Sequence, residues 1–286
     1  MDTTVNFNGS LLLKDTNFLN HENRGLRYGD ALFETLRIIN GKIVFWEDHY
    51  LRLMASMRIL RMEIPMTFTM EFLQEQLLRV ILANDMENSP ARVRLTVFRN
   101  NGGLYLPKSN DVSFIIEASA LKDPYYTLDP SSYEVALFKD FYVNANKLST
   151  LKTSNKLTHV LGSIFSNENN YDNCLLLNQN KFVVEALNAN IFLVVNNTVK
   201  TPPIMDGCLN GIIRKKLKEI FTRLGNYAFE ESSISPFELQ KADELFITNS
   251  ITGIRPITKF RKKEYSTKVA LDLLGKLNAK AIAERT

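Results

Sequence analysis

The sequence is poor in residues that build disulfide frameworks or metal centres. Its 286 residues include only two cysteines, Cys174 and Cys208, and their spacing matches neither a metal motif nor a disulfide framework. Isolated cysteines fit a reducing cytoplasm. No apolar run approaches the roughly 18 residues that span a bilayer, and the first residues lack the basic and apolar regions of a secretion signal. We therefore expect a cytoplasmic protein with no metal and no membrane contact.

Charge of one sign is not concentrated anywhere along the chain. The net charge is +4, the Lys and Arg residues are scattered, and the short basic runs at 214–216 and 261–263 are typical of solvated faces. We therefore expect no nucleic-acid partner. The composition, 45% hydrophobic and 23% charged, is ordinary for a globular protein. The length allows one large or two moderate domains, each with its own core.

The first 120 residues mix strand and helix patterns. We expect a strand and turn over 5–13, a hairpin around Asn40-Gly41, helices over 46–60 and 68–83, and strands over 91–98 and 112–118. The pattern breaks at Leu121-Lys122-Asp123-Pro124, which is the candidate interdomain linker. The predicted domains are therefore residues 1–119 and 127–286, joined by residues 120–126.

The second half of the chain repeats the mixture of strands and helices. We expect a hairpin over 174–186, a strand over 190–195, a rigid loop at Thr201-Pro202-Pro203, a helix from Gly211, a strand near 242–249 that runs into a polar turn, and a closing helix over 266–284. The sequence has no internal repeat and no low-complexity segment.

Lys152 precedes a helical pattern whose apolar residues begin at Leu157. Thr153, Ser154 and Asn155 are residue types that accept N–H bonds at a helix start, so we expect Lys152 to lie just before a helix. The partial positive charge of a helix N-terminus disfavours a protonated amine nearby. A neutral amine is a nucleophile that reacts with aldehydes. The alternative is an ordinary surface lysine.

Several other segments carry candidate anion-binding groups. Strand alternation places Phe33, Thr35 and Arg37 on one face, and it places Arg92 and Arg94 together on another strand. Paired arginines suit an anionic substrate, although a solvated strand face explains the Arg92–Arg94 pattern equally well. For the strand with Thr35 and Arg37, a solvated edge is the better explanation from the sequence alone. Glu185 ends an apolar strand, where a carboxylate needs a cationic partner if it is buried. The helix start after Gly211 and the turn at Thr248-Asn249-Ser250 are candidate phosphate seats.

Taken together, these segments resemble the class IV (fold-type IV) pyridoxal-phosphate enzymes. The similarity runs from about Arg24 to Pro256, and its most specific parts are residues 28–37, Lys152, residues 185–192, 201–203, 211–214 and 242–246. The family includes branched-chain and D-amino-acid aminotransferases and 4-amino-4-deoxychorismate lyases. The resemblance implies an α+β fold with a small N-terminal α/β sandwich and a larger C-terminal pseudo-barrel domain. It also implies pyridoxal 5'-phosphate as cofactor and a homodimer.

The resemblance assigns roles to individual residues. Lys152 would carry the aldimine and move protons, and Glu185 would pair with the pyridine nitrogen. The implied cofactor-binding residues are Arg52, Lys152, Glu185, Asn190, Ile212, Ile213 and Ser250. The implied catalytic residues are Lys152 and Thr35. The expected contacts to a small amino substrate come from Tyr28, Phe33, Arg37, Arg92 and Arg94.

The branch of the family is indicated by a few positions. Lys156 stands where branched-chain aminotransferases carry a Tyr, and Thr35 stands where lyases carry a threonine and branched-chain enzymes carry glycine. Thr248-Asn249-Ser250 resembles the turn of bacterial lyases, whereas Gly102-Gly103-Leu104-Tyr105 lacks a basic residue that some lyases have. The favoured hypothesis is a 4-amino-4-deoxychorismate lyase of folate biosynthesis. The alternatives are an aminotransferase for a branched-chain or D-amino acid with 2-oxoglutarate, and a catalytically inactive cofactor-binding protein.

Overall fold

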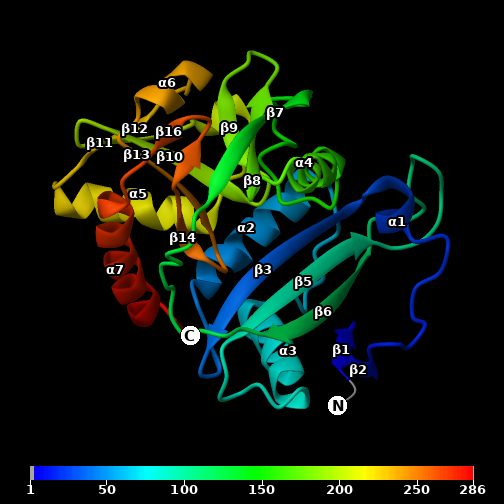
Figure 1. The fold of residues 1–286 in the computed structure, drawn as a ribbon. Coiled ribbons are helices and arrows are strands. Elements are labelled where there is room, and N and C mark those ends of the chain that lie inside the picture. Colours follow the sequence, from blue (N-terminus) through cyan, green and yellow to red (C-terminus); the bar gives the residue numbers. More distant parts are fainter. Residues whose placement is uncertain (1–2, 286) are drawn as a thin grey trace. The chain divides into compact units, whose positions relative to one another are not determined.

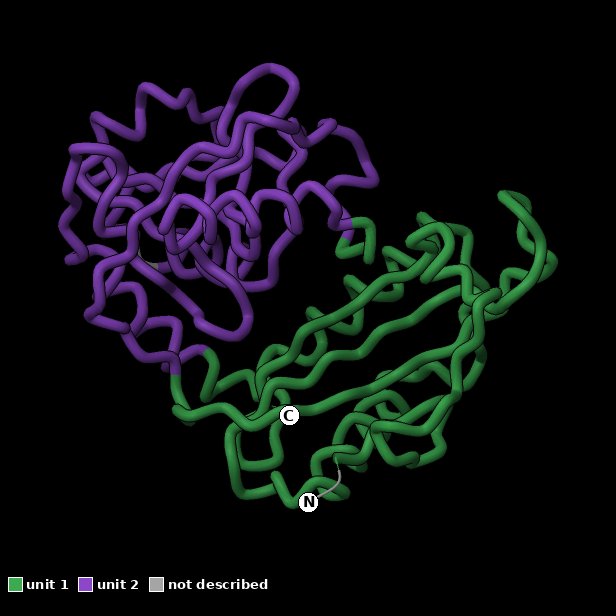
Figure 2. Tube along the Cα trace, turned by 45° about the vertical axis from the view of Figure 1, so that its right-hand side comes forward, with its two compact units in different colours: residues 1–125, 152–155, 281–286 green, residues 126–151, 156–280 purple. Residues whose placement is uncertain are grey.

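The computed structural model describes residues 3–285, and the chain divides into two compact units. The first unit comprises residues 1–125, 152–155 and 281–286, and the second comprises residues 126–151 and 156–280 (Figure 2). The first unit's main segment ends inside the predicted linker of residues 120–126. Residues 152–155 also belong to the first unit, whereas the predicted ranges include them in the C-terminal domain.

The first unit is built on a six-stranded antiparallel sheet in the order β2-β1-β6-β5-β3-β4 (Figure 1). Its elements are β1 (Thr4–Phe7), β2 (Ser10–Leu13), α1 (Arg24–Tyr28), β3 (Ala31–Ile39), β4 (Lys42–Ile43), α2 (Trp46–Ile59), α3 (Met70–Ala83), β5 (Ala91–Arg99) and β6 (Val112–Ala120). The predicted hairpin is confirmed, since Asn40 and Gly41 take the positive φ angles of 49° and 70° that a two-residue turn requires.

One face of this sheet is buried and the other stays partly open. Helix α2 packs on β3, while α3 packs on β1, β5 and β6. The predicted alternation on β5 is confirmed, because Val93, Leu95 and Val97 are fully buried while Arg92 and Arg94 are half-buried on the opposite face. The sheet therefore presents a row of polar side chains on the face away from its hydrophobic core.

The second unit is built on a ten-stranded mixed sheet that branches at β10, which pairs with β9, β11 and β13. Its elements are β7 (Glu134–Val143), α4 (Leu157–Glu168), β8 (Asn173–Asn178), β9 (Val183–Ala186), β10 (Ala189–Val195), β11 (Thr198–Thr201), the 3₁₀ turn Ile204–Asp206, α5 (Ile212–Leu224), β12 (Ala228–Glu231), α6 (Pro236–Lys241), β13 (Glu244–Asn249), β14 (Gly253–Ile257), β15 (Lys259–Phe260), β16 (Lys263–Glu264) and α7 (Lys268–Ala283). Helix α4 packs on β7 and β8, and α5 on β12 and β13. These elements confirm the predicted strands and helices of this half of the chain.

The start of α4 differs from the expectation. The helix begins at Leu157 and its N-cap, Lys156, makes no side-chain capping bond, so Thr153, Ser154 and Asn155 do not cap it. Their segment instead pairs with β3, as the bridge between Thr153 and Leu32 shows. Lys152 does precede this helix along the chain, as predicted, but residues 153–155 pair with β3 and do not supply the expected cap.

Among residues 3–285, no helix combines the length and the apolar character that crossing a membrane requires.

Candidate active site

Lys152 is held against the polar face of the first unit's sheet. Its carbonyl accepts a hydrogen bond from the Phe33 amide (2.9 Å), and the Ser154 amide donates to the Ala31 carbonyl (2.9 Å). These two bonds attach residues 152–155 to the beginning of β3. The Lys152 Nζ lies 4.3 Å from the centre of the Phe33 ring. The backbone pairing thus fixes the position from which the amine reaches this face.

The predicted site residues of β3 and β5 are neighbours on these two adjacent strands. Thr35 is paired with Arg94, Arg37 with Arg92, and Phe33 with Thr96. The Arg94 guanidinium carbon lies 3.8 Å from the Phe33 ring centre, and its Nε donates to the Thr96 hydroxyl (3.1 Å). Phe33 therefore contacts both Arg94 and Lys152, with the Thr35 side chain on the same face.

Arg94 has the electrostatic character of an anion-binding group. Burial lowers the pKa of its guanidinium, Glu117 raises it, and the neighbouring Arg92 lowers it again, with a net decrease. The Glu117 carboxylate lies 3.9 Å from the Arg94 Nε and its side chain is 55% exposed, so it compensates the charge only weakly. A bound carboxylate would therefore stabilise the charged form of Arg94.

The other predicted substrate residues lie in different surroundings. Arg37 is 5% exposed and donates to the carbonyls of Asp123 and Tyr125, so it anchors the segment that follows β6. Tyr28 ends α1, where its ring lies 5.7 Å from that of Tyr105. Its role as a substrate contact stays a prediction.

Arg52 is oriented by a buried carboxylate on β3. Its Nε donates to Glu34 Oε1 at 2.8 Å and its second amino group to Oε2 at 2.5 Å, while His49 Nδ1 lies 2.7 Å from Oε2. Burial raises the pKa of Glu34, but Arg52 and His49 outweigh it and hold the pKa at about 2. Burial lowers the pKa of His49, the bond to Glu34 raises it, and Arg52 and Lys152 lower it again, with a net decrease. The group therefore contains a carboxylate, a guanidinium and a neutral imidazole.

In the second unit, Glu185 is 4% exposed and is bonded through both oxygens. Its Oε2 accepts a hydrogen bond from the Leu209 amide (2.9 Å), and its Oε1 lies 3.0 Å from His159 Nε2 on α4. Lys156, the N-cap of α4, precedes His159 by three residues. Burial lowers the pKa of Lys156, and the Glu185 carboxylate partly opposes that change. The carboxylate that seemed unpartnered in the sequence is thus surrounded by donors.

The N-terminus of α5 lies beside Asn190. A Cβ on Gly211 would lie 2.0 Å from the Asn190 Oδ1, and the Asn190 Nδ2 donates to the Leu209 carbonyl (2.8 Å). Gly211 is the N-cap and makes no side-chain capping bond, so the first amides of α5, including those of Ile212 and Ile213, have no side-chain cap. These amides form a cradle of the kind that binds phosphate.

The strand next to the one that carries Asn190 has a buried hydroxyl, that of Thr248. Thr248 on β13 is paired with Asn190 on β10, and its Oγ1 is buried with no hydrogen-bond partner among the described residues. Ser250 follows in the turn that leads to β14, where the Asn249 side chain accepts the amides of Ile251 and Thr252. An unpaired buried hydroxyl and the Gly211 cradle both fit the phosphate of a bound cofactor.

Sequence reasoning missed Glu34 and His159. Glu34 carried a usable signal, since it occupies the inward-facing position of an apolar strand, where a carboxylate requires a cation. His159 carried none, because its partner is brought to it only by the packing of α4 on the sheet of the second unit.

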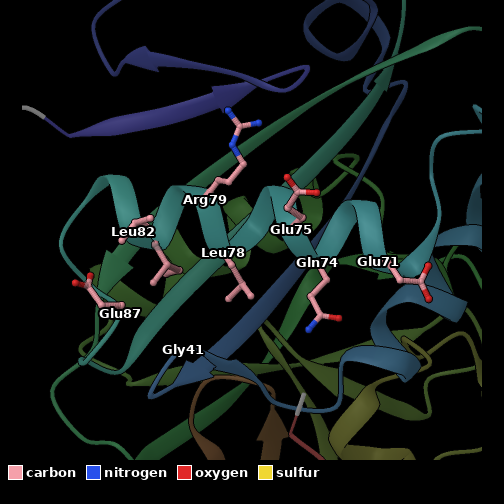
Figure 3. A pocket seen from close by; sticks show the side chains of 9 residues that line it. Gly41, Glu71, Gln74, Glu75, Leu78, Arg79, Leu82 and Glu87 are labelled. Atoms are coloured by element: carbon pink, nitrogen blue, oxygen red, sulfur yellow. The ribbon is translucent and has the colours of Figure 1, made fainter.

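A cavity of about 580 Å³ lies elsewhere in the first unit, along the outer face of α3. Leu78 and Leu82 line it together with Gly41 of the β3–β4 turn (Figure 3). None of the predicted site residues lines this cavity, and it contains no candidate nucleophile. This cavity is therefore not the candidate catalytic site.

The sequence matches the family model of amino-transferase class IV over residues 31–260. The chain therefore belongs to the class IV aminotransferases. This membership confirms the predicted family. It also confirms the predicted enzyme class, a transaminase or lyase that depends on pyridoxal 5'-phosphate.

Three known proteins illustrate the similarity. A provisionally named branched-chain-amino-acid aminotransferase of Methanocaldococcus jannaschii is 30% identical over 90% of this chain and 87% of its own. The branched-chain aminotransferase of Thermoproteus uzoniensis has the same fold, with a TM-score of 0.87, 23% identity, and coverage of 100% and 99% of the two chains. A provisionally named 4-amino-4-deoxychorismate lyase of Legionella pneumophila has a TM-score of 0.80, 24% identity, and coverage of 93% and 97%. These likenesses confirm the predicted fold class.

Proposed function

We propose that this protein is a 4-amino-4-deoxychorismate lyase, which releases pyruvate from its substrate and leaves 4-aminobenzoate. The observation that carries this proposal is the position of Thr35, whose side chain shares one sheet face with Phe33, the residue that contacts both Lys152 and Arg94. An elimination needs an acid for the departing group, and a transamination does not. A hydroxyl on the face that also presents the lysine suits that task.

Within each unit, the residues that the family resemblance assigns to the cofactor have suitable chemistry. Arg52, held by Glu34, and the α5 amides of Ile212 and Ile213 would bind the phosphate together with the hydroxyl of Ser250. Glu185 would pair with the ring nitrogen and keep it protonated, while Asn190 holds the loop that carries the Leu209 amide. When bound, pyridoxal phosphate supplies an electrophilic carbon for the substrate amine and a ring that accepts an electron pair.

The chain's own groups would then move one proton. Lys152 would remove the proton from the substrate carbon that bears the amine, the ether bond to the enolpyruvyl group would break, and the ring of the substrate would become aromatic. Thr35 would relay the same proton from Lys152 to the methylene carbon of the departing enolpyruvate, which becomes pyruvate. Arg94 would hold a substrate carboxylate throughout.

A second candidate function is transamination of a branched-chain or D-amino acid with 2-oxoglutarate. It is favoured by the relative from Methanocaldococcus jannaschii, whose provisional name is that of a branched-chain aminotransferase. The two reactions share every cofactor residue and differ in the fate of the substrate after the proton has been removed. Lys156, at the position of the branched-chain aminotransferase tyrosine, argues against the branched-chain reaction but does not separate a D-amino-acid aminotransferase from the lyase.

A reaction assay separates the two functions. The purified enzyme, loaded with pyridoxal phosphate, is given 4-amino-4-deoxychorismate without a keto acid, and pyruvate and 4-aminobenzoate are measured. Equal amounts of both products support the lyase, whereas activity that requires 2-oxoglutarate overturns it. Thr35→Val should lower kcat about 100-fold with little change in cofactor binding, since general acid catalysis contributes roughly that factor. Lys152→Ala should abolish turnover.

We also propose that the enzyme is a homodimer. Leu104, Tyr105 and Leu106 form an exposed apolar loop tip, with Tyr105 89% exposed. The buried Arg24 donates to the carbonyls of residues 102, 104 and 105, which keeps the loop in this conformation. A fixed apolar tip of this kind favours burial against a second copy. Light scattering should give twice the chain mass, and Tyr105→Asp should reduce it.

A further inference from the structure

Glu185 receives its two hydrogen bonds from groups of different kinds. The Leu209 amide belongs to the loop before α5, and the His159 imidazole belongs to the first turn of α4. Because the His159 side chain is 18% exposed and the Glu185 side chain 6% exposed, the pair is largely removed from water. A hydrogen bond to a charged group is stronger in such a place than at the surface.

The geometry determines where the imidazole proton lies. An ionised carboxylate only accepts hydrogen bonds, so His159 must carry its hydrogen on Nε2. Its Nδ1 is buried with no hydrogen-bond partner among the described residues. A second proton on Nδ1 would bury a donor with nothing to accept it, which is costly. The arrangement therefore directs an Nε2–H donor of His159 at the Glu185 carboxylate.

Lys156, the N-cap of α4, is a competing partner for the same carboxylate, since it interacts electrostatically with Glu185. A carboxylate that turned toward Lys156 would change its orientation toward the ring nitrogen. The hydrogen bond from His159 opposes that movement.

We propose that His159 is a positioning residue that holds the Glu185 carboxylate in one orientation for the ring nitrogen of the cofactor. This inference rests on the proposed function, in which Glu185 pairs with that nitrogen. It assigns to α4 a role beyond following the catalytic lysine in the chain, since its first turn carries the donor that fixes the acid.

The proton position is tested first in the cofactor-free protein. The chain has three histidines, so ¹⁵N imidazole spectra resolve them readily. His159 should show the tautomer with hydrogen on Nε2, and Glu185→Gln should alter its signal. A hydrogen on Nδ1 would overturn the inference without any reference to cofactor binding.

Cofactor binding is tested with matched variants. His159→Leu removes the donor, His159→Gln retains an N–H donor, and His21→Leu makes the same change at an exposed histidine. We expect His159→Leu to weaken pyridoxal phosphate binding about 10-fold and to shift its absorption, as loss of one hydrogen bond to a charged group would do. His159→Gln should restore most of the affinity, and His21→Leu should leave it unchanged.

The two hypotheses fail in different ways. A wild-type protein that takes up no pyridoxal phosphate, or that is labelled by borohydride at a lysine other than Lys152, refutes the proposed function. Wild-type uptake with equal affinity and absorption in His159→Leu refutes the positioning role alone. Circular dichroism of each variant identifies loss of folding. If His159→Leu does not fold, the tautomer of His159 in the wild-type protein still tests its hydrogen bond to Glu185.

Discussion

Replacing Glu34 with Gln should destabilise the protein by about 3 kcal/mol at neutral pH. Glu34 is completely buried between Arg52 and His49, which hold its pKa at about 2 instead of the usual 4.5. Each tenfold change in proton affinity is worth about 1.4 kcal/mol, so the native state favours the ionised carboxylate by about 3 kcal/mol. Removal of one partner from a buried ion pair costs a similar amount, because the Arg52 charge is left uncompensated.

The effect should depend on pH in a defined direction. A carboxylate whose pKa is lower in the folded state stabilises the protein fully above the unfolded pKa of 4.5, and that stabilisation is lost as the pH falls toward about 2. The difference between wild type and Glu34→Gln should therefore shrink from about 3 kcal/mol at pH 7 to about 1.5 kcal/mol at pH 3.

Urea unfolding at the two pH values measures this difference. Glu117→Gln is the matched control, because its side chain is 55% exposed and should change stability by less than about 0.5 kcal/mol. A Glu34→Gln effect below about 1 kcal/mol at pH 7, or one of equal size at both pH values, would show that the buried charges do not stabilise the fold as argued.

Three further substitutions test the site and its frame. Arg94→Gln should raise KM about 10-fold or more with a smaller change in kcat, since a charge-assisted bond to the substrate carboxylate is lost; steady-state kinetics check this, and an unchanged KM would exclude Arg94 as the anchor. Gly211→Ala should weaken cofactor binding, because its Cβ would lie 2.0 Å from the Asn190 Oδ1; titration with pyridoxal phosphate measures it, and wild-type affinity would argue against the cradle. Gly253→Ala should lower the melting temperature by several degrees, because φ is +69° and the new Cβ would lie 2.6 Å from the Tyr126 ring; an unchanged melting temperature would contradict this.

Local patterns predicted most of the secondary structure of this protein. The Asn40-Gly41 hairpin and the helix after Gly211 depend on neighbouring residues, so their signals are complete within a short stretch of sequence. The start of α4 could not be predicted in the same way. The residues expected to cap it, Thr153 among them, instead pair with β3, a strand that lies more than a hundred residues earlier in the chain.

The residues of the candidate site show the same difference between local and long-range signals. Lys152 and Glu185 were predicted as site residues because a nucleophilic amine and a carboxylate at the end of an apolar strand stand out in a family motif. His159 was not found, because a histidine on a helix gives no signal until the fold brings a carboxylate within 3.0 Å of it. The distinction among Arg37, Arg92 and Arg94 likewise required the structure, which shows Arg37 bonded to backbone carbonyls and Arg94 over Phe33.

The path of the backbone limits how this enzyme can be divided or recombined. Residues 152–155 belong to the first unit, although the chain on either side of them belongs to the second. A fragment that stops at Tyr125 would therefore keep the sheet but lack Lys152 and the segment that bonds to the start of β3. Expressing the first unit alone would require residues 152–155 to be joined to it by a new connection.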